Sequence, residues 1–217
     1  MEKGAKKNAK NLGTRIFLVR HGETDWNQTG RFQGRIDIPL NQGGKNQALA
    51  LALTLKDESI LTIYSSPLVR AMETAHFIKE FHPSTPLLEE EGLTEMDLGE
   101  FDGMEAEHWV AQYQEFIKTW RNTPSSVRMP GGESLQEVQI RAIDTLERIA
   151  NLYPSGSTLL LCGHNFVNRS ILCYVSDIPL DRFRDVRQDL AALNILCKNE
   201  GHWLAEVIND VSHLEKI

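Results

Sequence analysis

Residues 16–24 read Ile16-Phe17-Leu18-Val19-Arg20-His21-Gly22-Glu23-Thr24, four apolar residues followed directly by a cation, an imidazole and a glycine. An apolar run of this kind is typical of a parallel strand that is covered on both faces. Ligands of open α/β sheets bind just beyond the carboxyl ends of such strands. We therefore expect Arg20-His21-Gly22 to lie where the function is carried out, in a place suited to phosphate chemistry.

Further strand-like apolar runs follow along the chain, with helix-like segments between most of them. Strands are predicted over residues 15–20, 60–64, 158–162, 191–197 and 203–208. Helices are predicted over residues 42–55, 67–81, 105–120 and 134–152, with Pro67 in a first turn and a capping box of Ser134 and Glu137. This alternation predicts an α/β fold, a three-layer α/β/α sandwich with a mostly parallel central sheet.

The chain of 217 residues is long enough for one large domain, and no linker-like stretch divides it. We expect a basic, disordered lead over residues 1–14 and a single domain over residues 15–217. Residues 121–133 contain two prolines, two adjacent glycines and two arginines, a composition that predicts a surface loop. We interpret residues 104–132 as a lid-like insertion that overhangs a site.

The charge balance limits the classes of partner. Lys and Arg number 23 against 30 Asp and Glu, a net charge of −7, which disfavours nucleic-acid and membrane partners and leaves any anion to a local cluster. No apolar run approaches a membrane span or the core of a signal peptide, so we expect a cytoplasmic protein. Cys162, Cys173 and Cys197 are wrongly spaced for a disulfide framework or a zinc site, and we expect small apolar fillers.

Four separated segments place polar residues beside the ends of predicted strands. They are Arg20-His21-Gly22, Ser65-Ser66-Pro67 with Arg70, Leu93-Thr94-Glu95 and Gly163-His164-Asn165. Arg70 is expected one turn into its helix, pointing back to the sheet edge, and His164 at a helix N-terminus that favours anions. A metal site is a poor alternative, because the chain has no HExxH motif and no paired Asp/Glu ligand spacing.

With their flanking residues, these segments make the chain resemble the histidine phosphatase superfamily, which has the phosphoglycerate-mutase-like fold. The matching blocks are Arg20-His21-Gly22-Glu23-Thr24 with Trp26-Asn27 and Gly30-Arg31-Phe32-Gln33-Gly34, then Tyr64-Ser65-Ser66-Pro67 with Arg70-Ala71, then Leu93-Thr94-Glu95 and Gly99, and finally Gly163-His164 with Arg169. The resemblance covers about residues 15–209. Four ordered blocks are far more specific than one triplet.

The resemblance implies five catalytic residues. His21 is the nucleophile, attacking phosphorus through a neutral ring nitrogen. Arg20 and Arg70 clamp the phosphoryl oxygens, and His164 adds a donor as charge develops. Glu95 protonates the departing alkoxide and then activates water. Because this cluster takes the place of a metal ion, the resemblance implies no metal and no other cofactor.

Substrate binding is implied for a wider set that includes three of these five. It comprises Arg20, Asn27, Gln33, Gly34, Arg70, His164 and Asn165. The expected partner is a small-molecule phosphomonoester, and the chain is expected to be a monomer or a homodimer.

The sequence favours a phosphatase over a mutase within the superfamily. Leu98 stands where mutases carry a tyrosine shortly after the catalytic glutamate, and the stretch after Gly103 lacks their adjacent arginine pair. Asp102 replaces the more frequent glutamate, which we interpret as a tolerated change in packing. The predicted function is a metal-independent phosphomonoesterase that hydrolyses a small metabolite through a phosphohistidine.

Three alternatives stay open at this point: a cofactor-dependent phosphoglycerate mutase, a non-catalytic phosphate-binding regulatory member, and a metal-dependent hydrolase. Substrate choice is expected to lie in residues 104–132 and in the C-terminal tail. Arg121 and Arg128 are candidates for holding a carboxylate or a second phosphate. His213 either folds back to the pocket or belongs to a frayed terminus.

Overall fold

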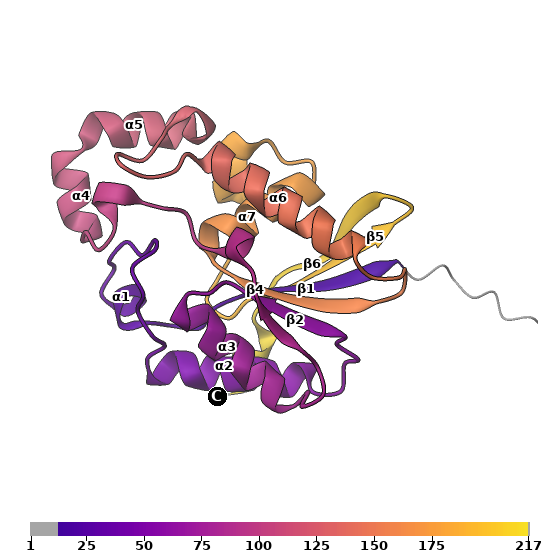
Figure 1. Cartoon of the computed structure of the whole chain (residues 1–217). Helices are drawn as coiled ribbons and strands as arrows, with labels where there is room; N and C mark the ends of the chain where they lie inside the picture. Colours follow the sequence, from indigo (N-terminus) through magenta and orange to yellow (C-terminus); the bar gives the residue numbers. More distant parts are fainter. Residues whose placement is uncertain (1–12, 217) are drawn as a thin grey trace, which may run out of the picture.

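The computed structural model describes residues 13–216, whose strands form one sheet of six (Figure 1). The strands are β1 (Thr14–Arg20), β2 (Thr62–Ser65), β3 (Leu87–Glu89), β4 (Thr158–Gly163), β5 (Leu193–Asn199) and β6 (His202–Asp210). Their order is β3-β2-β4-β1-β5-β6, with β3, β2, β4 and β1 parallel and β5 and β6 antiparallel to their neighbours. The predicted mostly parallel sheet is confirmed.

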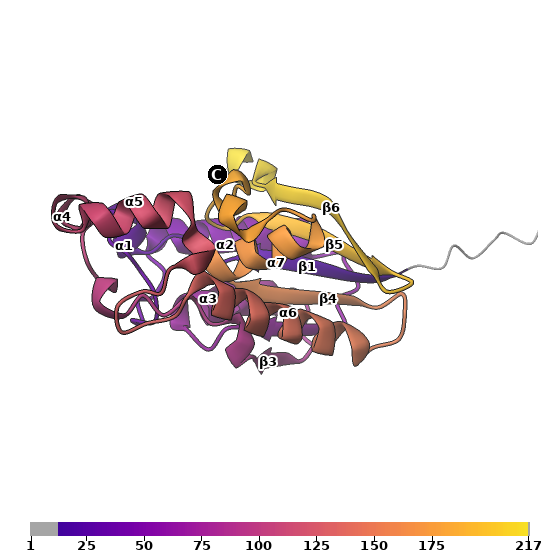
Figure 2. The same cartoon turned by 90° about the horizontal axis from the view of Figure 1, so that it is seen from above.

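Helices cover both faces of this sheet, as Figures 1 and 2 show. On one face lie α2 (Gln42–Leu55) and α3 (Val69–Glu80), and on the other α6 (Leu135–Asn151) and α7 (Asn165–Val175). Alternate residues of β1 join the two cores: Phe17 and Val19 pack with α2 and α3, whereas Ile16 and Leu18 pack with α6 and α7. A strand buried on both sides has no polar face, which explains its unbroken apolar run. The three-layer sandwich is confirmed.

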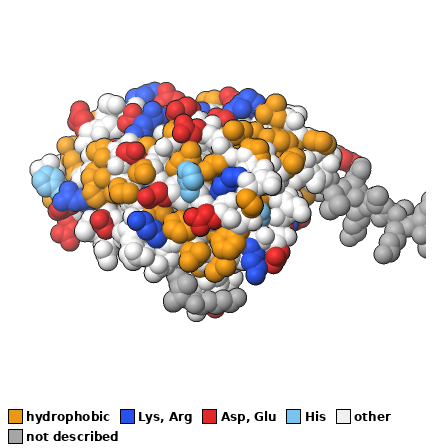
Figure 3. All heavy atoms as spheres, turned by 60° about the horizontal axis from the view of Figure 1, so that its bottom comes forward, with side chains coloured by type: hydrophobic (Ala, Val, Ile, Leu, Met, Phe, Trp, Pro, Cys, Tyr) orange, Lys and Arg blue, Asp and Glu red, His pale blue; other side chains and the backbone are white. Residues whose placement is uncertain are grey.

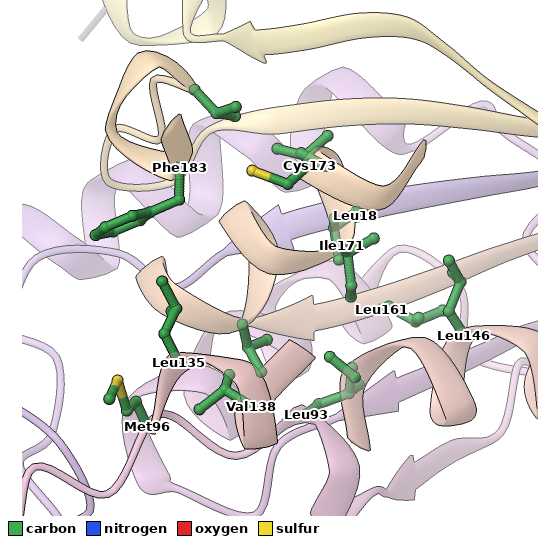
Figure 4. Close-up of a cluster of buried hydrophobic side chains, with 14 of the residues drawn as sticks. Leu18, Leu93, Met96, Leu135, Val138, Leu146, Leu161, Ile171, Cys173 and Phe183 are labelled. Carbon is green, nitrogen blue, oxygen red and sulfur yellow. The ribbon is translucent and has the colours of Figure 1, made fainter. Parts of the chain in front are cut away.

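The larger core lies between the sheet and α6 and α7. Figure 4 shows Leu18 of β1 beside Ile171 of α7, and Leu161 of β4 beside Leu146 of α6. The helix begins as predicted, because Ser134 Oγ accepts from the Glu137 main-chain N–H and the Glu137 carboxylate accepts from that of Ser134. The capping box thus fixes where α6 starts over the sheet.

The start of α3 differs from the prediction. The helix begins at Val69, two residues after Pro67, because Leu68 is still extended and its N–H donates to Ser66 Oγ in the turn that precedes the helix. Arg70 is therefore the second residue of α3 and not a full turn into it.

The helix predicted over residues 105–120 is wrong as a single element. The chain forms α4 (Ala106–Gln112) and α5 (Gln114–Asn122), and the helix breaks at Tyr113 with φ −118° and ψ 40°. The break lets the rings of Tyr113 and Phe116 pack edge-on against Phe101, at 4.8 and 5.0 Å between centroids. The loop predicted to begin at Arg121 begins after Asn122, where α5 ends. Figure 1 shows α4 and α5 beyond the carboxyl ends of the parallel strands, on the side of α1 (Asp25–Gln28).

Short 3₁₀ turns complete the described chain. They are Glu91–Leu93, Gly99–Phe101, Pro124–Ser126, Leu180–Asp185 and Ser212–Lys216. Cys162 and Cys173 are buried as predicted, but Cys197 is half-buried at the edge of the core. The lead predicted over residues 1–14 lies outside the described residues except for Gly13 and Thr14, and Thr14 already begins β1.

The surface and the helix lengths bear on the expected partners. On the face shown in Figure 3, Lys and Arg side chains are interspersed with Asp and Glu side chains and do not gather into a patch of one sign. Within residues 13–216, every helix is too short or too polar to cross a membrane.

Candidate active site

The register of the parallel strands brings the two motif histidines together. Arg20 of β1 pairs with Gly163 of β4, so the next residues, His21 and His164, leave the sheet side by side. The His21 N–H donates to the Gly163 carbonyl at 3.1 Å, and the two imidazole centroids are 5.1 Å apart. On the other side of β4, the Ser66 N–H donates to the Cys162 carbonyl at 3.0 Å. Three of the predicted segments thus meet at one sheet edge.

His21 is held as a neutral imidazole with one free nitrogen. Its side chain is 3% exposed, and its Nδ1 lies 2.7 Å from the Gly22 carbonyl. Because a carbonyl only accepts, Nδ1 carries the proton and Nε2 keeps its lone pair. Burial, helped by the charges of Arg70 and Arg20, lowers the pKa of His21 well below its usual value of 6.5. The result is a nucleophilic nitrogen at neutral pH.

The turn after His21 lies against the start of α2 with no side chain between them. A Cβ on Gly22 would lie 2.5 Å from the Gly44 carbonyl oxygen, and one on Gly44 would overlap the carbonyl of Glu23. Only glycine at both positions allows this approach. The His21 turn therefore rests on helix backbone.

His164 carries a proton donor that has no acceptor. Ser66 Oγ accepts from the Leu68 N–H at 3.3 Å, so its own proton is free for His164 Nε2, 2.8 Å away. With the Ser66 proton donated to Nε2, the imidazole proton is on Nδ1, which is buried and without a partner among the described residues. Burial and the charge of Arg70 lower the pKa of His164 well below 6.5. A neutral donor thus lies beside His21.

Arg20 and Arg70 bring positive charge to the same edge. Arg70 is fully buried and donates to the Gly34 and Ile36 carbonyls at 2.7 and 3.1 Å, and Arg20 Nη1 donates to the Gln188 carbonyl at 2.6 Å. Burial lowers the pKa of each guanidinium to about 10, which leaves both charged at neutral pH. These partners are neutral carbonyls and not carboxylates. The acidic side chain that acts most on both guanidiniums is Glu95, and two cations beside one carboxyl leave an excess of positive charge that favours the binding of an anion.

Glu95 lies at the N-terminus of α7, where His164 is the N-cap residue. Its carboxylate is 3% exposed and accepts from the Met96 N–H at 2.9 Å and the Phe166 N–H at 3.1 Å. Burial raises the pKa of Glu95 above its usual 4.5, although these N–H groups and the charge of Arg70 act in the opposite direction. Because burial dominates, the carboxyl is suited to donating a proton.

The four other predicted substrate-binding residues have separate roles in the structure. Asn27 Oδ1 accepts from the Thr24 N–H and caps α1. The Gln33 amide lies between Thr24 Oγ1 and the Arg70 guanidinium, donating to the first and accepting from the second. The Gly34 carbonyl binds Arg70. Asn165, the first residue of α7, is half-buried, and its side chain makes no hydrogen bond within residues 13–216. Gln33 and Gly34 therefore contact the anion-facing guanidinium.

Asp102 does more than fill space behind the site. Its Oδ1 accepts from the Gly34 N–H at 2.8 Å, and its Oδ2 accepts from the Arg35 and Ile36 N–H groups at 2.8 and 2.9 Å. The same turn presents the carbonyls that bind Arg70. Asp102 is therefore a positioning residue for Arg70, and it could not be found from sequence because the pairing joins segments 66 residues or more apart.

Replacing Asp102 with asparagine is expected to weaken the binding of inorganic phosphate about tenfold, because an amide nitrogen would face an N–H where an oxygen now accepts. Titration calorimetry with phosphate measures this. The substitution should add nothing in an Arg70→Ala background, and additive losses would contradict the positioning role. The matched control is Glu105→Gln, which removes only the exposed ion pair with Arg31.

Arg20 is positioned by a second group that sequence reasoning missed. Gln188, whose carbonyl binds Arg20, accepts from the Asn168 side chain at 3.0 Å and donates to that of Asn194 at 3.1 Å. Asn194 in turn accepts from the Asn209 N–H at 2.8 Å. The available signal was Asn194 itself, a polar residue within the apolar run predicted as a strand over residues 191–197.

The lid arginines are not part of this cluster, whereas His213 lies near Ala191, whose N–H donates to the His21 carbonyl. Arg128 donates to the Gly132 carbonyl and pairs with Glu137, so it braces the start of α6. Arg121 is exposed on α5. His213 is 4% exposed in a turn that packs against α2, which makes the frayed-terminus alternative wrong. Nowhere in residues 13–216 do three or more His, Cys, Asp or Glu side chains form a group that could hold a metal ion.

Taken together, these groups form a buried cluster suited to a tetrahedral anion next to a nucleophile. A free imidazole nitrogen, two guanidiniums and one unpartnered imidazole donor converge on one sheet edge. A buried carboxyl with a raised pKa lies on the adjoining helix end. Such a set can bind a phosphoryl group, accept it covalently and protonate its leaving group.

Known proteins share both the sequence and the shape of this chain. The model of the histidine phosphatase superfamily (branch 1) matches residues 16–211. Phosphoserine phosphatase 1 of Hydrogenobacter thermophilus is 32% identical over 200 residues, 92% of this chain and 94% of the relative. A probable phosphoglycerate mutase GpmB of Photorhabdus laumondii is 31% identical over 205 residues, with 92% and 94% covered. The solved structure of YhfR from Bacillus stearothermophilus superposes with a TM-score of 0.87 at 29% identity, covering 93% of this chain and 99% of that one.

Proposed function

Because this chain belongs to branch 1 of the histidine phosphatase superfamily, we propose that it hydrolyses a small phosphomonoester through a phosphohistidine intermediate, without a metal ion or other cofactor. The observation that carries the proposal is His21, whose Nδ1 is engaged by the Gly22 carbonyl so that Nε2 is free, and whose ring lies beside His164 and under the charges of Arg70 and Arg20. We further propose that the enzyme works in the cytoplasm, as a monomer or a homodimer, with residues 104–132 acting as a lid.

In the first half-reaction, His21 Nε2 attacks phosphorus, a P–N bond forms and the ester P–O bond breaks. Arg20 and Arg70 hold the phosphoryl oxygens, and the Nδ1–H of His164 donates to the oxygen on which charge develops. Glu95 gives its proton to the departing alkoxide, so a neutral alcohol leaves.

In the second half-reaction, Glu95 is a carboxylate and takes a proton from a water molecule. The water oxygen attacks phosphorus, the P–N bond breaks and its electron pair returns to His21 Nε2. Inorganic phosphate then leaves, and Glu95 is again protonated. The Met96 and Phe166 N–H groups stabilise the charged carboxylate of Glu95, whereas burial stabilises its neutral acid. These opposing effects make both protonation states accessible during the reaction.

A second candidate is a phosphoglycerate mutase, supported by the name of the Photorhabdus relative. A mutase must hold the phosphoenzyme against water until the second substrate alcohol arrives. Buried Leu98, at the position where mutases carry a tyrosine, offers no hydrogen bond to a phosphoglycerate. We therefore favour the hydrolase, and favour both enzymes over a non-catalytic phosphate-binding member, since all five catalytic side chains are present and assembled.

A substrate panel tests the reaction class. Phosphoserine, 3-phosphoglycerate, sugar phosphates and bisphosphates are incubated with the enzyme and a chelator, and phosphate release is measured. We expect release from at least one monoester, unchanged within about twofold by the chelator, because guanidiniums take the place of a metal ion. Loss of activity with chelator would identify a metal-dependent hydrolase. Phosphoryl exchange between phosphoglycerates faster than phosphate release would identify a mutase.

A further inference from the structure

Two arginines pack against one aromatic ring near the start of α7. The guanidinium carbon of half-buried Arg169 lies 5.8 Å from the centre of the Phe183 ring, and that of exposed Arg184 lies 4.6 Å from the same centre. The Phe183 ring also packs against that of Phe166, at 5.9 Å between centroids. Arg169 and Arg184 are called the arginine pair below.

The arginine pair lies close to the catalytic carboxyl. The Phe166 N–H donates to Glu95 at 3.1 Å, and Arg169 follows Phe166 by three residues, so both face the same side of α7. Side chains on a helix lean toward its N-terminus, which directs Arg169 back to the end where Glu95 lies. Burial lowers the pKa of Arg169 below its usual value, and the charge of Glu95 is the strongest effect in the opposite direction. The alcohol that Glu95 protonates therefore leaves within reach of the charge of Arg169.

The carboxylates that follow the arginine pair in the chain are taken by other cations. Asp185 pairs with Arg182 at 2.7 Å and Asp189 with Arg187 at 2.6 Å. Asp189 also attracts Arg169, but less than Glu95 does. Within residues 13–216, neither member of the arginine pair forms an ion pair with a carboxylate. Both charges are thus left for a ligand.

The contact with Phe183 leaves hydrogen-bond donors of the arginine pair unused. A cation–π contact uses the charge of a guanidinium and none of its N–H groups. The Nε of Arg169 is buried and has no partner among the described residues, whereas Arg184 donates through one Nη to the Trp120 carbonyl at 3.0 Å. A buried N–H without an acceptor is unfavourable, so an anion that accepts from Arg169 relieves a defect of the free protein.

The lid brings the second arginine into place. The guanidinium carbon of Arg184 lies 5.2 Å from the centre of the Trp120 ring, which belongs to α5. Burial lowers the pKa of Arg184 below its usual value, and the charges of Arg169 and Arg121 lower it further. Cations that repel one another across so short a distance favour an anion between them. Arg121 adds to this positive field from its exposed position on α5.

We propose that the arginine pair is a second anion site, which holds an anionic group of the leaving alcohol while Arg20 and Arg70 hold the phosphoryl group. The substrate is then the phosphate ester of a small alcohol that carries a carboxylate or a second phosphate. This proposal rests on the phosphatase function proposed above and names its substrate class. Arg169, next to Glu95, determines the specificity, and Arg184 assists it from the side of the lid.

Pairs of esters that differ by one anionic group test the proposal. They are phosphoserine with phosphoethanolamine, 3-phosphoglycerate with glycerol 3-phosphate, and propane-1,3-diol bisphosphate with 3-hydroxypropyl phosphate. In at least one pair we expect kcat/KM to be about tenfold or more higher for the ester with the extra group, because only that ester gains charge-assisted hydrogen bonds to Arg169. The first two pairs test a carboxylate and the third a second phosphate, so the largest ratio identifies the group.

Substitutions locate this preference. Arg169→Gln should bring the ratio within about threefold of one, chiefly by raising KM for the anionic ester, and Arg169→Lys should keep part of the preference because it keeps the charge. Arg184→Gln should lower the ratio about threefold, since an exposed cation contributes less. Arg182→Gln is the matched control, because Arg182 lies in the same turn and pairs only with exposed Asp185. Any loss of folding or of catalysis lowers kcat/KM for both esters and cancels in the ratio.

Binding to His21→Ala separates this proposal from the one on which it rests. The variant has no nucleophile, so titration calorimetry measures its affinity for each ester without turnover. Tighter binding of the anionic ester, lost when Arg169→Gln is added, supports the second anion site; if wild-type enzyme then released no phosphate, only the phosphatase would be overturned. Equal kcat/KM and equal affinity within every pair, or a preference that survives Arg169→Gln, would overturn the second anion site and leave the phosphatase intact.

Discussion

Replacing His21 with alanine is expected to abolish phosphate release, lowering kcat by at least about 10³-fold. No other described side chain in the pocket offers an uncharged nitrogen lone pair: the His164 imidazole has Nε2 engaged with Ser66 and a proton on Nδ1, and both guanidiniums are charged. The remaining cluster should still bind phosphate, so KM and the inhibition by inorganic phosphate should change far less than kcat.

The measurement pairs turnover with detection of the covalent intermediate. Wild-type protein quenched in alkali after incubation with a ³²P-labelled substrate should carry an acid-labile, alkali-stable label, and His21→Ala should carry none. His202→Ala is the matched control, because His202 is exposed on β6 away from the sheet edge that holds His21. Undiminished turnover in His21→Ala would sink the mechanism.

Replacing Glu95 with glutamine is expected to slow hydrolysis of alkyl phosphates by about 10²- to 10⁴-fold, because the amide can accept the Phe166 N–H but can neither give nor take the catalytic proton. An aryl ester such as p-nitrophenyl phosphate needs no proton on its leaving group. The variant should therefore release one equivalent of nitrophenol in a burst and accumulate the phosphoenzyme, which it cannot hydrolyse. Equal slowing for both kinds of ester, with no burst, would contradict the role of Glu95.

The pH dependence supplies an independent check on Glu95. The first half-reaction needs neutral His21, whose pKa is lowered well below 6.5, and protonated Glu95, whose pKa is raised above 4.5. Activity should fall on the acid side as His21 gains its proton and on the alkaline side as Glu95 loses one. In Glu95→Gln the alkaline limb should disappear from kcat/KM while the acid limb stays. An alkaline limb that persists would assign it to another group.

Much of the fold and the assembled site follow from local patterns in the sequence. The buried strand that ends at Arg20 and the one that ends at Gly163 are parallel neighbours, and parallel strands bring their carboxyl ends to one edge. The sequence predicts that both strands end at this edge, and the structure adds that they are direct neighbours, which brings His21 and His164 together. The capping box at Ser134 was equally local, since its two residues are three apart.

The features that sequence reasoning missed depend on contacts between distant segments. Asp102 holds the turn at Gly34 through three N–H groups, and Gln188 holds Arg20 through a carbonyl, neither of which leaves a periodic signal. The break at Tyr113 has the same origin. The aromatic spacing fits one continuous helix, but the Phe101 ring from outside it draws the side chains inward and ends the helix early.

The glycine contact between Gly22 and Gly44 has a consequence for how this sequence can change over generations. Two segments that touch backbone to backbone cannot be altered one at a time, since any side chain at either position pushes the His21 turn away from α2. A compensating change would have to move a helix, which no single substitution does. The neighbourhood of the nucleophile is therefore held fixed by the lack of side chains.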